Sequence, residues 1–294
     1  MSKFIDLQKF RVYIYLVFEI YESKIKEMER LIMSKRFEDK VIIITGAGSG
    51  LGQVTAVTVA KDGAKLALVD LNSNGLEETK KLILEVAPEA ELLLVTANVA
   101  DEAAVKNYVD ETVNKFGRID GFFNNAGIEG KQNLTEDFGI DEFHKVVNVN
   151  LNGVFYGLKY VLAEMKKNGA GSVVNTASVG GIRGVGNQSG YSASKHGVVG
   201  LTRNSGIEYG QFGININAIA PGAIMTPMVE ASLKQIGGEE GWEEAGKEFV
   251  SANPMKRFGK PQEVANVVAF LLSDESKFVN ASVITIDGGQ SYKY

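Results

Sequence analysis

The sequence predicts an α/β fold, in which a doubly wound parallel sheet of about seven strands carries helices on both faces. Short, continuous apolar runs indicate strands that are buried on both faces, and stretches with helical periodicity separate these runs. The chain also contains 33 glycines but only 5 prolines, which fits many tight turns between strands and helices. Together these observations favour one large domain built on a parallel sheet.

The predicted elements follow one another regularly from Met33 onward. Strands are expected at 41–44, 65–69, 92–99, 119–123, 173–177, 214–220 and 281–287. Helices are expected at 53–62, 103–116 and 264–272, in a long stretch that includes 146–158, and in a stretch that starts near residue 191. Because neither an internal repeat nor a linker interrupts this alternation, residues 33–294 are predicted to form a single domain.

Residues 227–253 depart from the alternation, since they are helical in pattern but rich in glycine and glutamate. We expect this segment to be a lid over a bound substrate. Met225, Met228 and Trp242 lie in or next to it, and Ile182 precedes the helix near 191. These four residues are candidate apolar walls of a substrate pocket, although each could equally be an ordinary packing residue.

The first 32 residues differ from the rest of the chain. Their aromatic run at 12–18 is much shorter than the ~20 apolar residues that span a bilayer. Arg11 interrupts any signal-peptide core, and no small-residue cleavage site follows. We therefore expect no membrane span and a cytoplasmic protein. Residues 1–32 are interpreted as an optional extension, or as the product of an upstream start codon ahead of Met33, with a membrane-surface or oligomer-contact arm as the alternative.

Composition excludes several classes of function. A net charge of −5 argues against a nucleic-acid-binding surface. The absence of cysteine excludes disulfides and thiolate nucleophiles, and with only His144 and His196 present no cysteine- or histidine-rich metal site is expected. If the protein performs redox chemistry, a bound nucleotide must supply it.

A glycine-rich turn, Thr45–Gly52, directly follows the first predicted strand and opens a helix. Such a turn brings backbone N–H groups close to a pyrophosphate, so it predicts a Rossmann-type dinucleotide site. Asp70 closes the second strand about twenty positions later, where a carboxylate can accept hydrogen bonds from an adenosine ribose. Because it would repel a 2′-phosphate, Asp70 favours NAD(H) over NADP(H). Asn98, which ends the third strand, is placed to meet the adenine.

A second chemical motif lies in the later half of the chain. Tyr191 and Lys195 are four residues apart, so they share one face of the predicted helix. A cation beside a phenol, whose pKa is ordinarily about 10, lowers that pKa and makes the phenol a usable general acid or base. Ser178 lies thirteen positions upstream, where an apolar run ends in small polar residues. The three side chains are therefore candidates for one catalytic site.

These motifs, in this order and at this spacing, resemble the short-chain dehydrogenase/reductase family over essentially all of 33–294. The residues that carry the resemblance are Thr45–Gly52, Asn124–Gly127, Ser178, Tyr191 with Lys195, and Pro221–Thr226. The resemblance implies a catalytic tetrad of Asn150, Ser178, Tyr191 and Lys195. It also implies a cofactor site made by Gly46, Ser49, Gly50, Leu51, Gly52, Asp70, Asn98, Val99, Asn125, Ala126, Gly127, Tyr191, Lys195, Pro221, Gly222, Ile224 and Thr226.

The roles of the tetrad are likewise implied by the family. Ser178 would hydrogen-bond the substrate oxygen, and Tyr191 would give or take its proton while NAD(H) exchanges a hydride with the carbonyl carbon. Lys195 would lower the Tyr191 pKa and hold the nicotinamide ribose, and Asn150 would position a water that links Lys195 to solvent. One departure is Asn98, where the family usually has Asp; an amide oxygen can still accept from the adenine amino group.

The predicted function is interconversion of a secondary alcohol and a ketone, with a cyclic or hydrophobic substrate. Met228, Met225, Ile182 and Glu129 are the candidate substrate contacts, and Glu129 is equally consistent with a solvated loop charge. The alternatives are a sugar dehydrogenase, a 3-oxoacyl-carrier-protein reductase, and a non-catalytic dinucleotide sensor. Asp70 disfavours the second, and the presence of both Tyr191 and Lys195 disfavours the third. The family resemblance also implies a homotetramer.

Overall fold

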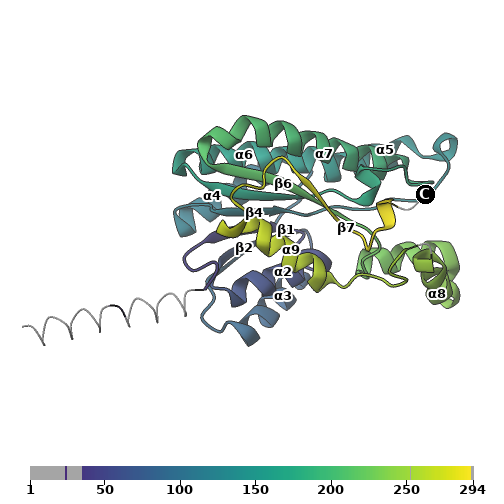
Figure 1. Ribbon diagram of the computed structural model, residues 1–294, viewed down its shortest axis with the longest axis horizontal. Helices are drawn as coiled ribbons and strands as arrows, with labels where there is room; N and C mark the ends of the chain where they lie inside the picture. The colour runs from purple at the N-terminus through teal and green to yellow at the C-terminus, as the bar shows by residue number, and fades with distance from the viewer. Residues whose placement is uncertain (1–23, 25–34, 252, 293–294) are drawn as a thin grey trace, which may run out of the picture.

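Seven parallel strands form a sheet through the centre of the molecule, in the order β3-β2-β1-β4-β5-β6-β7 (Figure 1). This computed structural model describes residues 24, 35–251 and 253–292. Every neighbouring pair of strands runs parallel, which confirms the predicted fold class. The strands are β1 (Val41–Thr45), β2 (Lys65–Asp70), β3 (Leu92–Thr96), β4 (Gly121–Asn124), β5 (Gly171–Thr176), β6 (Ile214–Pro221) and β7 (Val283–Ile286).

Alternate residues of the strands build two separate cores. Ile43 of β1 belongs to one hydrophobic cluster, whereas Ile42 and Ile44 belong to the other. In the same way Phe122 and Phe123 of β4 point to opposite clusters. Since successive side chains of a strand alternate between its faces, a sheet covered on both sides needs the continuous apolar runs seen in the sequence.

Helices cover each face of the sheet (Figure 1). One core contains residues of α4 (Glu102–Phe116), α6 (Gly153–Asn168) and α7 (Ser189–Tyr209), and the other contains residues of α2 (Gly50–Lys61), α3 (Ser73–Val86) and α9 (Pro261–Leu272). Helix α3 has no counterpart among the helices predicted from sequence. Two further helices, α5 (Ile140–Val147) and α8 (Pro227–Ser251), lie toward the end of the molecule where the strands terminate.

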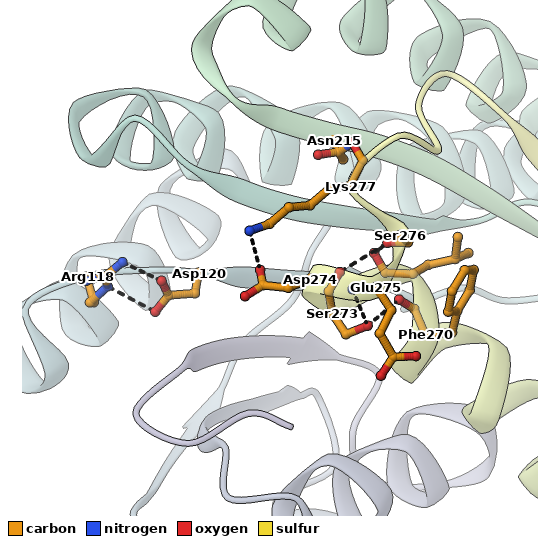
Figure 2. A network of polar contacts seen from close by, with 10 residues as sticks. Arg118, Asp120, Asn215, Phe270, Ser273, Asp274, Glu275, Ser276 and Lys277 are labelled. Atoms are coloured by element: carbon orange, nitrogen blue, oxygen red, sulfur yellow. Dashed lines mark hydrogen bonds and ion pairs between the residues drawn. The ribbon is translucent and has the colours of Figure 1, made fainter. Parts of the chain in front are cut away.

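Polar contacts close the amino edge of the sheet (Figure 2). Arg118 donates to Asp120 at 3.0 Å between Nε and Oδ2, and the same carboxylate oxygen accepts the backbone N–H of Val41 at 3.0 Å. Asn215 near the start of β6 donates through Nδ2 to the carbonyl oxygen of Lys277 at 2.8 Å. The bonds to the Val41 N–H and the Lys277 carbonyl satisfy backbone groups at this edge, so the edge serves stability.

The opposite, carboxyl edge contains a topological switch point. From β1 the chain crosses to β2 and β3 on one side and to β4 and β5 on the other. The crossovers therefore leave a crevice beyond the ends of β1 and β4, which is where ligands bind in open α/β sheets.

Residues 1–32 lie outside the described part of the chain, except for Lys24. Its interpretation as an extension stays a prediction, as does the single-domain boundary at residue 33. In the part of the chain that the structure describes, no helix is long and apolar enough to cross a membrane.

Candidate active site

A cavity of about 370 Å³ opens at the carboxyl edge of the sheet, and segments that follow β1 to β6 all contribute to it. Its lining residues are Gly46, Ser49, Gly50, Leu51, Asp70, Leu71, Ala97, Asn98, Val99, Asn125, Ala126, Gly127, Ile128, Val149, Thr176, Ala177, Ser178, Tyr191, Lys195, Pro221, Gly222, Ile224, Thr226, Pro227, Met228 and Val229. One end of the cavity is thus made by the glycine turn and Asp70, and another by Ser178, Tyr191 and Lys195.

The glycine turn is shaped for close approach of a ligand to the backbone. Gly46 and Gly50 have φ values of 65° and 54°, which glycine adopts without strain. A Cβ on Gly46 would lie 2.9 Å from Nδ2 of Asn125, so a larger residue cannot take its place. Helix α2 begins at Gly50, and Ser49 before it makes no side-chain cap, which leaves the helix N-terminus facing the cavity. Backbone N–H groups placed in this way suit a pyrophosphate.

Asp70 is held in place by two backbone donors. Its Oδ2 accepts the N–H of Gly48 at 2.9 Å and its Oδ1 accepts the N–H of Asn72 at 2.8 Å. A Cβ on Gly48 would lie 3.0 Å from the Asp70 carboxyl carbon. Glycine at position 48 therefore lets the turn pack closely against the Asp70 carboxylate. The turn and this fixed negative charge at the cavity together suit a dinucleotide whose adenosine ribose carries free hydroxyls.

Ser178, Tyr191 and Lys195 meet at the cavity from two elements. Ser178 follows β5, and Tyr191 and Lys195 lie on α7, where their spacing places both on the face toward the sheet. The Ser178 and Tyr191 side chains share a hydrogen bond. Lys195 is only 3% exposed, and its Nζ donates to the carbonyl oxygen of Thr176 at 2.7 Å. The sequence prediction that these three residues share one site thus agrees with where the structure places them.

The pKa of Tyr191 shifts in the direction opposite to the predicted one. Burial raises the pKa of Tyr191 above its ordinary value of 10.0; the hydrogen bond from Ser178 opposes this effect, and the negative charge of Glu129 adds to it. Burial also lowers the pKa of Lys195 to about 8. The net shift of the Tyr191 pKa is thus upward, opposite to the expected lowering, because burial of the phenol is the largest effect. Lys195 Nζ lies over the Tyr191 ring, 5.6 Å from its centroid, and its role in lowering the Tyr191 pKa stays a prediction.

Asn150 lies behind the cavity lining, in a π-helical turn, η2 (Asn148–Asn152), between α5 and α6. Its Oδ1 accepts the N–H of Ile128 at 2.8 Å, and its Nδ2 donates to the Ile128 carbonyl at 2.8 Å and to Oγ of Ser194 at 3.2 Å. The side chain is completely buried, so the π turn directs a polar group inward that these bonds satisfy. Asn150 thereby fixes Ile128, which does line the cavity.

Known proteins match the chain over most of its length. A family model described as enoyl-(acyl carrier protein) reductase matches residues 46–291. Levodione reductase of Leifsonia aquatica is 63% identical over 259 residues, which are 88% of this chain and 97% of that protein. Cyclohexanol dehydrogenase of Acinetobacter sp. (strain SE19) is 43% identical over 263 residues, which are 89% of this chain and 99% of that protein. The chain belongs to the short-chain dehydrogenase/reductase family.

Solved structures of the short-chain dehydrogenase/reductase family share the fold. The crystal structure of levodione reductase matches with a TM-score of 0.87 at 63% identity and covers 88% of this chain and 100% of its own. Carveol dehydrogenase from Mycobacterium avium, solved in complex with NAD, matches with a TM-score of 0.84 at 28% identity and covers 88% and 100%. The family resemblance predicted from the motifs is thus confirmed.

Most residues predicted to bind a cofactor of the family line the cavity, and Gly52 is the exception. A Cβ on Gly52 would lie 2.1 Å from the carbonyl oxygen of Gly46, so Gly52 lets α2 pack against the turn. Among the predicted substrate contacts, Met228 lines the cavity, whereas Met225, Ile182 and Glu129 do not. Trp242 of the expected lid is half-buried next to Gly237, outside the lining.

The structure adds lining residues that the sequence analysis did not single out. Six of them sit within two positions of predicted residues at strand or loop ends, and this proximity in the chain is a signal that could have found them: Leu71, Ala97, Ile128, Thr176, Ala177 and Pro227. Val149 comes from the π turn, and Val229 from the first turn of α8. Each of these two also lies beside a predicted residue, Asn150 and Met228 respectively, so adjacency could have found them too.

Proposed function

We propose that the protein is an NAD(H)-dependent oxidoreductase that interconverts a secondary alcohol and a cyclic or hydrophobic ketone. The observation that carries this proposal is the Tyr191 phenol, hydrogen-bonded to Ser178 and set in the same cavity as the glycine turn and Asp70. A proton-transfer group and a dinucleotide-shaped site in one cavity are what alcohol–ketone redox chemistry requires.

The residues of the glycine turn would hold the pyrophosphate, and Asp70 would accept hydrogen bonds from the adenosine ribose. Asn98 and Val99 line the cavity close to Asp70 and would meet the adenine, while Ile224 and Thr226 would meet the carboxamide. NAD(H), when bound, supplies or accepts the hydride. The fixed Asp70 charge would repel a 2′-phosphate, so NAD(H) is proposed over NADP(H).

In ketone reduction the phenol of Tyr191 donates its proton to the developing alkoxide oxygen, and in alcohol oxidation the phenolate accepts it. Ser178 holds the same oxygen by donating its hydroxyl, which stabilises the charge that develops there. The raised pKa of Tyr191 keeps the phenol protonated at neutral pH, which suits the reductive direction. Lys195 would hold ribose hydroxyls, and Asn150, which bonds both backbone groups of Ile128, would keep the cavity wall in position.

The substrate class rests on the relatives and on the cavity wall together. Levodione reductase, cyclohexanol dehydrogenase and carveol dehydrogenase are all named for cyclic compounds. Met228 and Val229 of α8, with Ile128 and Val149, give the cavity apolar side chains that suit a ring without many hydroxyls.

We also propose a homotetramer, as the family resemblance implies, and a cytoplasmic location, as the sequence analysis expects. Large apolar side chains are exposed on the two helices through which family members pair, at Phe155 of α6 (48% exposed) and Ile207 of α7 (78% exposed). Exposed apolar groups of this size suit burial between subunits.

The function is tested by following NADH and NADPH oxidation at 340 nm with a panel of carbonyl compounds. The panel contains levodione-like cyclic diketones, cyclohexanones and acetoacetyl thioesters, and glucose is tested in the reverse direction with NAD and NADP. NADH-linked turnover of the cyclic ketones is the expected result. Turnover confined to thioesters with NADPH, or to glucose, would overturn the proposed substrate class.

Asp70→Ser should weaken the preference for NADH over NADPH by about 10–100-fold, because a carboxylate that bonds ribose hydroxyls and repels a phosphate contributes ~1.5–3 kcal/mol. The ratio of kcat/KM for the two cofactors measures this preference. Asp101→Ser is a matched control, since Asp101 caps α4 and does not line the cavity. An unchanged ratio in Asp70→Ser would assign the cofactor preference to other residues.

A further inference from the structure

Helix α8 projects from one end of the molecule, beside the carboxyl edge of the sheet (Figure 1). Its first turn forms part of the cavity wall through Pro227, Met228 and Val229. Gly238, with φ 72° and ψ 178°, breaks the helix into two parts. The part before this break, 227–237, is called here the lid segment; its position decides whether the cavity is closed on that side.

One hydroxyl group joins the lid segment to the loop that follows β4. Oγ of Ser232 accepts a hydrogen bond from Nε2 of Gln132 at 2.7 Å and donates one to Oε1 of Glu129 at 2.9 Å. Ser232 is only 9% exposed, so water has little access to replace these bonds. Both partners belong to the segment between β4 and α5, which is far from α8 in the chain.

The loop after β4 is also hydrogen-bonded to Gln188, which precedes the Tyr191 helix, and to Asn150. Glu129 Oε1 accepts a second hydrogen bond from Nε2 of Gln188, the residue that immediately precedes α7 and lies three positions before Tyr191. The residue next to Glu129 in the chain, Ile128, is held at both backbone groups by Asn150. Hydrogen bonds thus connect the lid segment through Glu129 to Gln188, before the Tyr191 helix. The peptide link between Glu129 and Ile128 connects this set to Asn150.

We propose that Gln132 and Ser232 form a latch that holds the lid segment closed against a substrate, and that both are positioning residues for the reaction. Neither lines the cavity, so they act through Glu129 and the lid segment and not on the substrate itself. A closed lid excludes water and retains the substrate, so loss of the latch weakens substrate binding. The part of the proposal that concerns the reaction rests on the proposed function, while the part that concerns the lid does not.

Hydrogen exchange of full-length Ser232→Ala tests the latch without any need for activity. A hydrogen bond to a charged group contributes enough free energy for about a tenfold change in an opening equilibrium, so backbone amides of 227–237 should exchange about tenfold faster. Gln132→Ala removes one of the two bonds from a half-exposed loop position and should give a smaller increase in the same amides. The only tryptophan of the chain, Trp242, lies in the second part of α8, and its fluorescence gives an independent signal of lid opening.

Ser251→Ala is the matched control, because Ser251 is also on α8 but donates only to the Glu248 carbonyl of its own helix. With a cyclic ketone as substrate, Ser232→Ala should raise KM about tenfold and change kcat by less than about twofold, whereas Ser251→Ala should change neither. Unchanged exchange at 227–237 in both Ser232→Ala and Gln132→Ala would overturn the latch. Faster exchange without a rise in KM would overturn its role in the reaction. Absence of turnover in the wild type, with faster exchange in Ser232→Ala, would count against the proposed function alone.

Discussion

Tyr191→Phe should lower kcat for ketone reduction by about 10²–10⁴-fold, the range by which a positioned proton donor accelerates such a step. The substitution keeps the aromatic ring in place and removes only the oxygen that bonds Ser178. NADH affinity should fall by less than about tenfold, because one neutral hydrogen bond is at stake. Steady-state kinetics and an NADH titration by fluorescence measure the two effects separately.

Tyr160→Phe provides the control for this experiment. Tyr160 is on α6 and donates its hydroxyl to Glu102 at 2.8 Å on the surface, so its loss should leave kcat unchanged within about twofold. A Tyr191→Phe enzyme that kept more than about a tenth of the wild-type kcat would show that another group donates the proton.

Lys195→Met should abolish most activity and at the same time increase the free energy of unfolding at pH 7. Burial lowers the pKa of Lys195 from 10.5 to about 8, and a shift of this size corresponds to about 3 kcal/mol of destabilisation by the charged form. Methionine fills a similar volume without a charge, but it leaves the Thr176 carbonyl without its 2.7 Å donor. The net gain expected is therefore about 1–3 kcal/mol.

The pH dependence of this gain has a defined sign. Between pH 8 and 10.5 the unfolded chain binds more protons at Lys195 than the folded protein does, so wild-type stability rises with pH in that window. The advantage of Lys195→Met should be complete below pH 8 and should shrink as the pH approaches 10.5. Urea unfolding of both proteins at pH 7 and at about pH 10 measures the difference.

Lys159→Met serves as the comparison, since the Lys159 side chain is 48% exposed and pairs with Glu102 on the surface. Replacement there should change stability much less than Lys195→Met does, at either pH, because solvent screens a surface ion pair. A stability gain of Lys195→Met that did not depend on pH would show that packing, and not the buried charge, is responsible.

Strand β1 illustrates how much of the fold follows from local sequence. The run Val41–Ile44 needs no knowledge of distant residues to be assigned as a strand with two buried faces, and Ile42 and Ile43 indeed enter different cores. The turn at Gly46 and the carboxylate of Asp70 follow from the same local reasoning. Strand ends and glycine turns are fixed by neighbouring residues, so the cavity at the carboxyl edge was predictable.

The Tyr191–Lys195 pair shows where this reasoning stops. Helical spacing predicted correctly that both side chains face one site, but it does not give the direction of the ammonium or the extent of burial. Those depend on β5, whose Thr176 carbonyl accepts a hydrogen bond from Nζ, and on the packing that buries Lys195 and half-buries Tyr191. The hydrogen-bond partners of Glu129 could not be predicted either, because Ser232 is 103 positions away in the chain. The pKa of a buried group and the partners of a loop carboxylate depend on tertiary contacts, which local sequence does not specify.

The π turn at Asn148–Asn152 has a consequence for comparing chain lengths between relatives. An α-helix turns about 100° per residue, and a π turn accommodates one residue more than the α-helical path. Residues 140–168 therefore resemble a single long helix in sequence. Across the π turn at Asn150, however, the helix face that points inward shifts by one residue. A relative that lacks one residue here would keep an unbroken helix and lose the inward amide. A gap aligned to 148–152 should thus be treated as the loss of the inward Asn150 amide and not as a change of length alone.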